Sequence, residues 1–166
     1  MKFVSIIMGS KSDYEVVYEA AKILNEFGVA YEMIVSSAHR SPARTAKYVA
    51  DAEKKGAQVF ICAAGMAAHL AGAVAANPTK PVLGVPLGGS ALSGVDALYS
   101  TVQMPAGIPV ATLAIGKAGA KNAAYLAVQI LALSDEVLSS KLKADRAAKA
   151  EALKKDSEQI EVLLEG

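Results

Sequence analysis

The chain is predicted to be an α/β protein: a three-layer, doubly wound parallel sheet of flavodoxin-like order with a C-terminal helical extension. Three observations predict this class. Short runs rich in Val and Ile are apolar at every position, as strands of a parallel sheet covered on both faces are. Segments with apolar residues at helical spacing alternate with these runs. Several runs end in loops of Gly, Ser and Ala that open the next helix, which is typical of ligand sites in such sheets.

The elements follow one another in regular alternation. The strands are expected at Phe3–Met8, Tyr31–Ser36, Gln58–Ala63, Pro81–Val85 and Pro109–Ile115. The helices are expected at Asp13–Phe27, Ser41–Lys55, Met66–Ala76, part of residues 91–103, and Ala118–Leu133. Glycines end the first two helices, and Ser41-Pro42 places a cap residue and a first-turn proline at the start of the second. The alternation favours the strand order 2-1-3-4-5, in which the loops after strands one, two and three are neighbours.

The 166 residues divide into a domain and a tail. Residues 1–133 are expected to form a single α/β domain that carries the chemistry, and residues 134–166 a charged helical tail with widely spaced apolar residues. This helix either docks on its own domain or reaches a neighbouring subunit, and the sequence leaves both open.

Charge is distributed unevenly along the chain. The formal net charge of +1 gives no strong electrostatic case for binding nucleic acid or a membrane. Between Gly56 and Gly116 the only charged residues are Lys80 and Asp96. A transmembrane interpretation of the uncharged residues 59–76 is disfavoured, because the stretch begins as a β-type run and is rich in Ala and Gly. So little charge in a small domain instead predicts a surface covered by other subunits, and hence a homo-oligomer.

The only cysteine and the start of the chain indicate an ordinary cytoplasmic protein. Cys62 lies in an apolar run and is interpreted as a small buried side chain rather than a nucleophile. No charged segment with a cleavage site opens the sequence, which favours a cytoplasmic location.

The only two histidines both fall in loops that follow predicted strands. His39 lies in Ser36-Ser37-Ala38-His39-Arg40-Ser41-Pro42, and His69 in Ala64-Gly65-Met66-Ala67-Ala68-His69. Imidazole changes its charge near neutral pH, so either is a candidate for proton transfer. The alternatives are a surface His-Arg pair in a turn and a structural histidine at the start of a helix. Two histidines without a nearby carboxylate or cysteine pair do not make a metal site.

A third loop, Gly9-Ser10-Lys11-Ser12-Asp13, has features of an anion site. It lacks the glycine patterns of dinucleotide folds and P-loops, but its hydroxyls and the amides that open the next helix can hold a phosphate. The alternative is an ordinary helix cap. Arg40 supplies a planar charged donor suited to phosphate. Residues 86–96, rich in Gly and Ser, are either a flexible cover over the site or a tight turn.

Together these segments resemble the PurE family of N5-carboxyaminoimidazole ribonucleotide mutases of purine biosynthesis, in its class I branch, over residues 3–133. The resemblance is carried by Met8-Gly9-Ser10-Lys11-Ser12-Asp13, Ser37-Ala38-His39-Arg40-Ser41-Pro42, Ala67-Ala68-His69-Leu70, Gly84-Val85-Pro86, Leu92-Ser93-Gly94-Val95-Asp96, residues 102–112 and Lys121-Asn122-Ala123-Ala124. It implies a flavodoxin-like fold, an octamer, and no metal or organic cofactor. The implied reaction moves a carboxylate from N5 to C4 of an aminoimidazole ribonucleotide.

The resemblance also implies roles for individual residues. Those expected to hold the ribose 5-phosphate are Ser10, Ser12, Asp13 and Arg40. Those expected to line the imidazole and carboxylate pocket are Ser37, Ala64 and Gly65, and Leu70 is expected to be a further substrate-binding residue. His39 resembles the general acid/base, and His69 matches a residue expected to shape the pocket. Two alternatives stay open: a carboxylase that uses free carbon dioxide on aminoimidazole ribonucleotide, and a non-catalytic nucleotide-binding module.

Two positions depart from the pattern of the family. Most members carry Gly and Pro where this chain has Met66 and Ala71. Both changes fall at the start of the predicted third helix, so substrate fit there is expected to differ modestly while the fold is kept.

Overall fold

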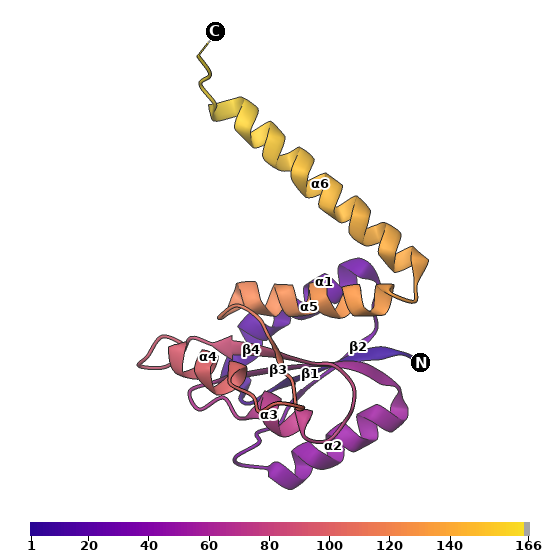
Figure 1. Ribbon diagram of the computed structural model, residues 1–166, viewed down its shortest axis with the longest axis vertical. Helices are drawn as coiled ribbons and strands as arrows, with labels where there is room; N and C mark the ends of the chain where they lie inside the picture. Colours follow the sequence, from indigo (N-terminus) through magenta and orange to yellow (C-terminus); the bar gives the residue numbers. More distant parts are fainter. Residues whose placement is uncertain (165–166) are drawn as a thin grey trace. The chain divides into compact units, whose positions relative to one another are not determined.

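A five-stranded parallel sheet forms the centre of the protein in the computed structural model, which describes residues 1–164. The strands are β1 (Phe3–Met8), β2 (Tyr31–Val35), β3 (Ala57–Gly65), β4 (Val82–Leu87) and β5 (Ala111–Thr112). Their order is β2-β1-β3-β4-β5, and every neighbouring pair is parallel (Figure 1). The predicted fold class and strand order are confirmed.

Helices cover both faces of this sheet. They are the 3₁₀ turn η1 (Lys11–Asp13) and the helices α1 (Tyr14–Phe27), α2 (Pro42–Lys55), α3 (Leu70–Ala75), α4 (Val95–Val102), α5 (Lys117–Ala132) and α6 (Glu136–Ile160). Figure 1 shows α1 and α5 on one face, where the rings of Phe27 and Tyr125 meet edge to face at 5.6 Å. The other face is covered by α2, α3 and α4. These three layers bury both faces of the strands.

Burial on both faces explains why polar and apolar residues do not alternate along the central strands. All residues of β1 and β4 are buried, as are most of β3. Gly84 of β4 is needed for the packing of α4: a Cβ there would lie 2.4 Å from Thr101 Cγ2 and 2.9 Å from Val110 Cγ1. The absence of a side chain at this one position therefore lets the helix layer approach the sheet closely.

Two predicted elements are shorter than expected. The strand predicted over Pro109–Ile115 is regular only at Ala111–Thr112, at the edge of the sheet. Pro109 has no N–H to donate, and beyond Thr112 the chain keeps single hydrogen bonds to β4, from Leu113 N–H to the Gly84 carbonyl oxygen and from Gly116 N–H to the Pro86 carbonyl oxygen, both at 2.9 Å. The helix predicted over Met66–Ala76 begins only at Leu70. Met66 has a φ of 56°, a left-handed conformation that no residue inside an α-helix adopts.

The uncharged residues 59–76 thus form most of β3, a loop and α3. Across the part of the chain described here, no helix combines the length and the apolar character that crossing a membrane requires.

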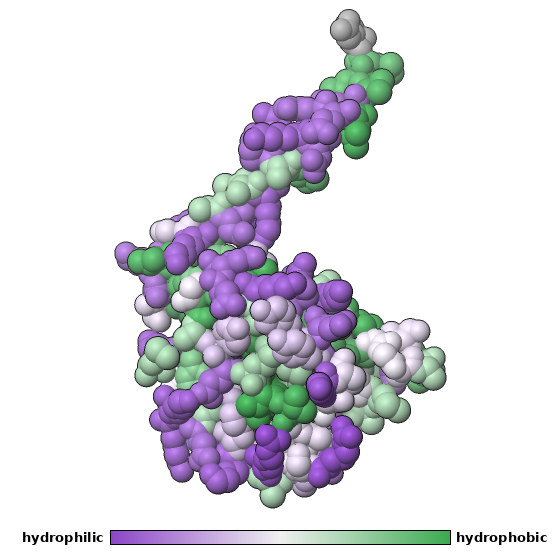
Figure 2. All heavy atoms as spheres, turned by 180° about the vertical axis from the view of Figure 1, so that it is seen from behind, coloured by the Kyte–Doolittle hydropathy of each residue, from purple (hydrophilic) through white to green (hydrophobic). Residues whose placement is uncertain are grey.

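The chain forms two compact units, Met1–Val128 and the residues from Gln129 onward. In the second unit α6 begins at a capped end, where the Asp135 carboxylate accepts a hydrogen bond from Leu138 N–H at 3.0 Å. No residue of α6 is buried. Figure 2 shows hydrophilic side chains along most of this helix, and hydrophobic ones at the end of the described chain, where Val162, Leu163 and Leu164 are exposed.

Candidate active site

Three loops at the carboxyl ends of neighbouring strands meet at one edge of the sheet. They are the first loop (residues 9–13), the second loop (residues 36–41) and the third loop (residues 65–69). The Arg40 guanidinium donates a hydrogen bond to the Gly9 carbonyl oxygen at 3.3 Å, which joins the second loop to the first. Gly9 N–H in turn donates to the Ala63 carbonyl oxygen at the end of β3, at 3.2 Å. Loops that the sequence separates by about thirty residues thus form one surface, as expected at a topological switch point.

The two histidines meet on this surface. The rings of His39 and His69 are stacked, with centroids 5.1 Å apart and planes inclined by 19°. Both residues are exposed, and neither imidazole has a hydrogen-bond partner within residues 1–164. The ring nitrogens are therefore available to a ligand, and a bound heterocycle at this edge would lie within reach of an imidazole that can donate or accept a proton.

The first loop is a well-formed helix cap. Ser10 N–H donates to the Asp13 carboxylate at 3.0 Å, and Ser12 N–H donates to Ser10 Oγ at 3.3 Å. Since these amides already have acceptors, a phosphate here would depend on the hydroxyls of Ser10 and Ser12 and on Arg40. The interpretation as a cap is thus confirmed, and the anion site stays a prediction that rests on side chains.

Asp13 has a distinct electrostatic environment. Partial burial raises the pKa of its carboxyl above the ordinary value, while the hydrogen bonds from Ser10 and Ser12 and the charge of Arg40 oppose the rise. A carboxylate repels a phosphate directly but accepts hydrogen bonds from hydroxyls. The Asp13 carboxylate is therefore better suited to accepting hydrogen bonds from hydroxyl groups of a ligand than to contacting an anion.

Arg40 is oriented by its neighbours and remains exposed. Its backbone N–H donates to Ser37 Oγ at 3.1 Å. Within residues 1–164 the Arg40 side chain makes a single hydrogen bond, to the Gly9 carbonyl oxygen. The remaining guanidinium donors face outward beside the first loop and can bind an anion there.

The third loop has an unusual backbone. Ala64 and Gly65 end β3, and the next residue, Met66, is two-thirds exposed in its left-handed conformation. Two tight hydrogen bonds follow, from Ala68 N–H to the Met66 carbonyl oxygen and from His69 N–H to the Ala67 carbonyl oxygen. A glycine adopts such a φ without strain, so the glycine that the family resemblance leads one to expect here would suit this backbone better than methionine.

Two apolar residues of the third segment lie away from the site. Leu70 is the first residue of α3, and its side chain is part of the core cluster with Phe60 and Val74. A direct contact of Leu70 with a substrate would therefore come from its backbone. Ala71 is the second residue of α3, a position in the first turn where proline is also tolerated, so the exchange of Pro for Ala leaves the helix intact.

Sequence reasoning missed one polar residue. Ser41, expected to cap α2, makes no side-chain cap bond; its hydroxyl instead contacts Ser37 on the far side of His39 and Arg40. The two serines lie four residues apart around the histidine, and this spacing is the only signal of the contact in the sequence.

Of the two interpretations of residues 86–96, the structure supports the tight turn. Ser93 N–H donates to the Ser90 carbonyl oxygen at 3.0 Å, and Ser90 Oγ donates to the Asp96 carboxylate at 2.8 Å. Ser93 and Gly94 both have positive φ, and Gly94 lies close against Ile115.

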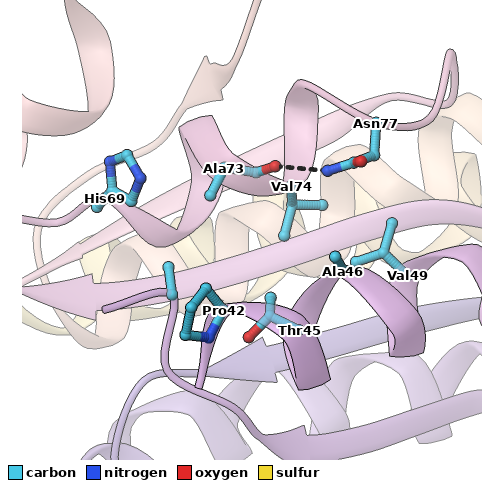
Figure 3. A pocket seen from close by; sticks show the side chains of 9 residues that line it. Pro42, Thr45, Ala46, Val49, His69, Ala73, Val74 and Asn77 are labelled. Atoms are coloured by element: carbon cyan, nitrogen blue, oxygen red, sulfur yellow. Dashed lines mark hydrogen bonds between the residues drawn. The ribbon is translucent and has the colours of Figure 1, made fainter. Parts of the chain in front are cut away.

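A small pocket lies between α2 and α3, with His69 at one end (Figure 3). Its lining is mainly apolar, from Pro42, Ala46, Val49, Ala73 and Val74, with Thr45 and Asn77 as further polar groups. The Asn77 amide donates to the Ala73 carbonyl oxygen at 2.9 Å. Neither Lys nor Arg lines the pocket, so the anion site predicted from the sequence is better placed over the three loops.

Other candidate chemistries find no support in the described residues. Cys62 is buried, and its burial raises the pKa of the thiol far above the ordinary value, so it is an apolar core residue as predicted. Within residues 1–164 there is no group of three His, Cys, Asp or Glu side chains placed to hold a metal ion.

A family model described as AIR carboxylase matches residues 3–152. The chain belongs to the AIR carboxylase family. Within this family, N5-carboxyaminoimidazole ribonucleotide mutase of Vibrio cholerae is 53% identical over 150 residues, covering 90% of this chain and 93% of that protein. The protein of the same name from Escherichia coli K12 is 55% identical over 139 residues, covering 84% and 82%.

Solved structures agree with this family assignment. The crystal structure of Treponema denticola PurE matches with a TM-score of 0.88 at 27% identity and covers 98% of this chain and 100% of its own. The resemblance to the PurE family and the flavodoxin-like fold are therefore confirmed.

Proposed function

We propose that this AIR carboxylase family member is an N5-carboxyaminoimidazole ribonucleotide mutase, an isomerase of purine biosynthesis. The observation that carries the proposal is the juxtaposition of His39, His69 and Arg40 above the ends of β1, β2 and β3. A proton-transfer group next to a phosphate-binding cation fits an aminoimidazole ribonucleotide. Relatives that bear the name of the mutase and are more than half identical to this chain support it.

His39 is proposed as the general acid/base. Its protonated imidazole gives a proton to N5 as the bond from N5 to the carboxylate carbon breaks, which releases carbon dioxide and the neutral amine. C4 of the electron-rich ring then attacks the carbon dioxide, and the new C–C bond leaves C4 bearing a surplus proton. The now neutral His39 takes that proton, and the ring regains its aromaticity. His39 therefore gives one proton to N5 and regains one from C4, so no further base is required.

The remaining site residues are proposed to hold the reactants together. Ser10, Ser12 and Arg40 bind the 5-phosphate, and Asp13 accepts hydrogen bonds from the ribose. Ser37, Ala64 and Gly65 surround the ring and the migrating carboxylate, with His69 stacked on His39 and the backbone of Leu70 completing the wall. Carbon dioxide confined in this space meets C4 before it diffuses away, which is a proximity effect.

A homo-oligomer, an octamer by family resemblance, is proposed as the working form. In the charge-poor region between Gly56 and Gly116, large apolar side chains are exposed on a single chain, among them Met66, Leu92, Val95, Tyr99 and Val102. Such a surface is typical of a contact between subunits. A cytoplasmic location is proposed because a phosphorylated intermediate is too polar to leave the compartment in which it is made.

The mutase and the carboxylase are distinguished by the source of the transferred carbon. The enzyme is given N5-carboxyaminoimidazole ribonucleotide in the presence of ¹³C-bicarbonate and, separately, aminoimidazole ribonucleotide with the same bicarbonate. A mutase forms unlabelled product from the first substrate. Labelled product formed only from the second substrate would establish the carboxylase. Binding without product from either would leave a nucleotide-binding module.

A further inference from the structure

We infer that Ser41 is a positioning residue for the reaction, an inference that rests on the proposed function. Together with Ser37 it forms what we term the serine clamp, two side chains that close the turn containing Ala38, His39 and Arg40. Ser37 N–H donates to Ser41 Oγ at 3.2 Å, and Ser41 Oγ–H donates to the Ser37 carbonyl oxygen at 3.1 Å. One hydroxyl thus satisfies both backbone groups of the residue four positions earlier.

The clamp uses a hydroxyl that would ordinarily stabilise a helix. Serine at the position before an α-helix normally accepts a hydrogen bond from the second or third helical N–H. Ser41 precedes α2 at the capping position, yet its side chain makes no such bond. Its φ of −145° and ψ of 57° turn the side chain back toward the second loop. The local geometry therefore favours order in the loop over the usual cap of the helix.

Further bonds make the turn rigid. Ser41 N–H donates to the Ser37 carbonyl oxygen at 2.9 Å, and Arg40 N–H donates to Ser37 Oγ at 3.1 Å. The turn is also anchored to α2 by Thr45, a buried residue. Its hydroxyl lies 3.1 Å from the Ser41 carbonyl oxygen and 2.7 Å from the hydroxyl of Ser36. All three residues between the clamping serines are thus held from both ends.

The consequence is a fixed direction for both functional side chains. His39 leaves the turn toward His69, and Arg40 leaves it toward Gly9. A proton donor displaced by about 1 Å from its acceptor can lose about 10²-fold in rate. The Ser41 hydroxyl makes its hydrogen bonds to the backbone of Ser37, so it acts through the backbone of the turn rather than as a catalytic residue.

The experiment compares Ser41→Ala with Ser41→Thr in the full-length protein. Alanine removes the clamping hydroxyl, whereas threonine keeps it and is compatible with the extended φ of this position. We expect Ser41→Ala to lower kcat by about 10- to 100-fold at saturating substrate, with a smaller change in KM. Ser41→Thr should stay within about threefold of the wild type.

Ser100→Ala is the matched control. Ser100 Oγ donates to the Asp96 carbonyl oxygen at 2.7 Å, also a hydroxyl-to-carbonyl bond across four residues, but it belongs to α4 and to none of the three loops. It should lower the melting temperature by an amount similar to Ser41→Ala and leave kcat unchanged. A merely structural Ser41 would behave like this control, and a kcat of Ser41→Ala within twofold of the wild type would overturn the inference.

A second readout does not depend on turnover. The protein has only two histidines, so the imidazole C–H signals in a proton NMR spectrum are few, and His39→Asn assigns them. Ser41→Ala should shift or split the His39 signals, while Ser41→Thr and Ser100→Ala should leave them in place. Unmoved His39 signals in Ser41→Ala overturn the inference even if the wild type proves inactive, a result that would count against the proposed function alone.

Discussion

Helices α1 and α6 show two different ways in which this chain becomes helical. In α1, 14 residues long, the buried side chains Val17, Ala20, Ala21, Ile23, Leu24 and Phe27 form one apolar face. In α6, 25 residues long, no side chain is buried. The first helix ends at Gly28, whose left-handed conformation lets the chain turn into β2. The second begins at the Asp135 cap and carries ion pairs such as Lys149–Asp145, at 2.7 Å.

The difference separates tertiary from local causes of structure. The spacing of apolar residues in α1 gives the helix one apolar face, which is buried against the sheet. Burial of such a face is the main source of helix stability in globular proteins. The length of α6 is supported instead by Ala-rich composition, capping and pairs four residues apart, each of which contributes only tenths of a kcal/mol to about 1 kcal/mol. Changes within Met1–Val128 should therefore affect chemistry, folding or the subunit contact proposed there, whereas changes in α6 should affect assembly and leave the chemistry intact.

The largest expected effect in the α/β unit comes from His39→Asn. Loss of a general acid/base typically costs about 10²–10⁴-fold in rate. The fold and the binding of ribonucleotide should persist, because the ring is exposed and has no hydrogen-bond partner within residues 1–164. Steady-state kinetics and calorimetric binding check this. Turnover close to that of the wild type would remove His39 from the mechanism.

Arg40→Ala should act on binding rather than on proton transfer. A hydrogen bond to a charged group is worth about 1.5–3 kcal/mol, so KM should rise about 10- to 150-fold while kcat changes less. The comparison ligand is an analogue without the phosphate, which should bind equally poorly to both proteins. Equal weakening of the analogue and the substrate by the substitution would place Arg40 elsewhere than on the phosphate.

Gly84→Ala tests the packing of the same unit without touching the loops. The added methyl group would overlap Thr101 and Val110, and overpacking typically costs about 1–3 kcal/mol. The free energy of unfolding in urea measures it. Gly89→Ala is the control, because nothing lies within 4 Å of the Cβ it would add. Equal stability of the two variants would show that α4 can shift away from the sheet.

Truncation after Leu133 removes α6 and tests its role in assembly. We predict that α6 packs on a neighbouring subunit as well as on its own, since apolar residues as sparse as Leu138, Leu142 and Leu153 do not hold an isolated helix in water. The truncated protein should form a weaker oligomer, with a melting temperature lower by about 2–8 °C, and keep measurable activity. Light scattering and thermal unfolding provide the readouts. An unchanged oligomer and melting temperature would leave α6 without a role in assembly.

The smallest effect is expected from Asp135→Ala. Removing this N-cap costs about 1 kcal/mol of helix stability, so α6 should fray at its first turn while kcat stays constant. Circular dichroism at low temperature, with Asp135→Asn as the variant that keeps a capping oxygen, measures the change. A parallel loss of activity would contradict the separation between the two units.

Much of the site could be predicted because topology constrains it. Once the sequence predicts alternating strands and helices, the loops that contain Ser10, His39 and His69 must fall on one edge of the sheet. The left-handed Met66 was not predictable from propensity, because methionine is an ordinary helix former and the helix was expected to begin there. The orientation of Ser41 was missed for a similar reason: Ser-Pro before a helix predicts a cap, and only the position of Ser37 draws the hydroxyl away.

The fold class and the two histidine loops follow from the sequence alone, because hydrophobic periodicity and glycine positions are local properties that each segment carries with it, and the favoured strand order follows from the alternation of strands and helices. The packed structure is needed to show that His39 and His69 stack, that Arg40 donates a hydrogen bond to Gly9, and that Leu70 faces the core rather than the site. These are contacts between segments about thirty residues apart, and their geometry depends on how β1, β2 and β3 align in register. A pattern along the chain predicts which residues come near one another, whereas the packed backbone sets the direction in which each side chain points.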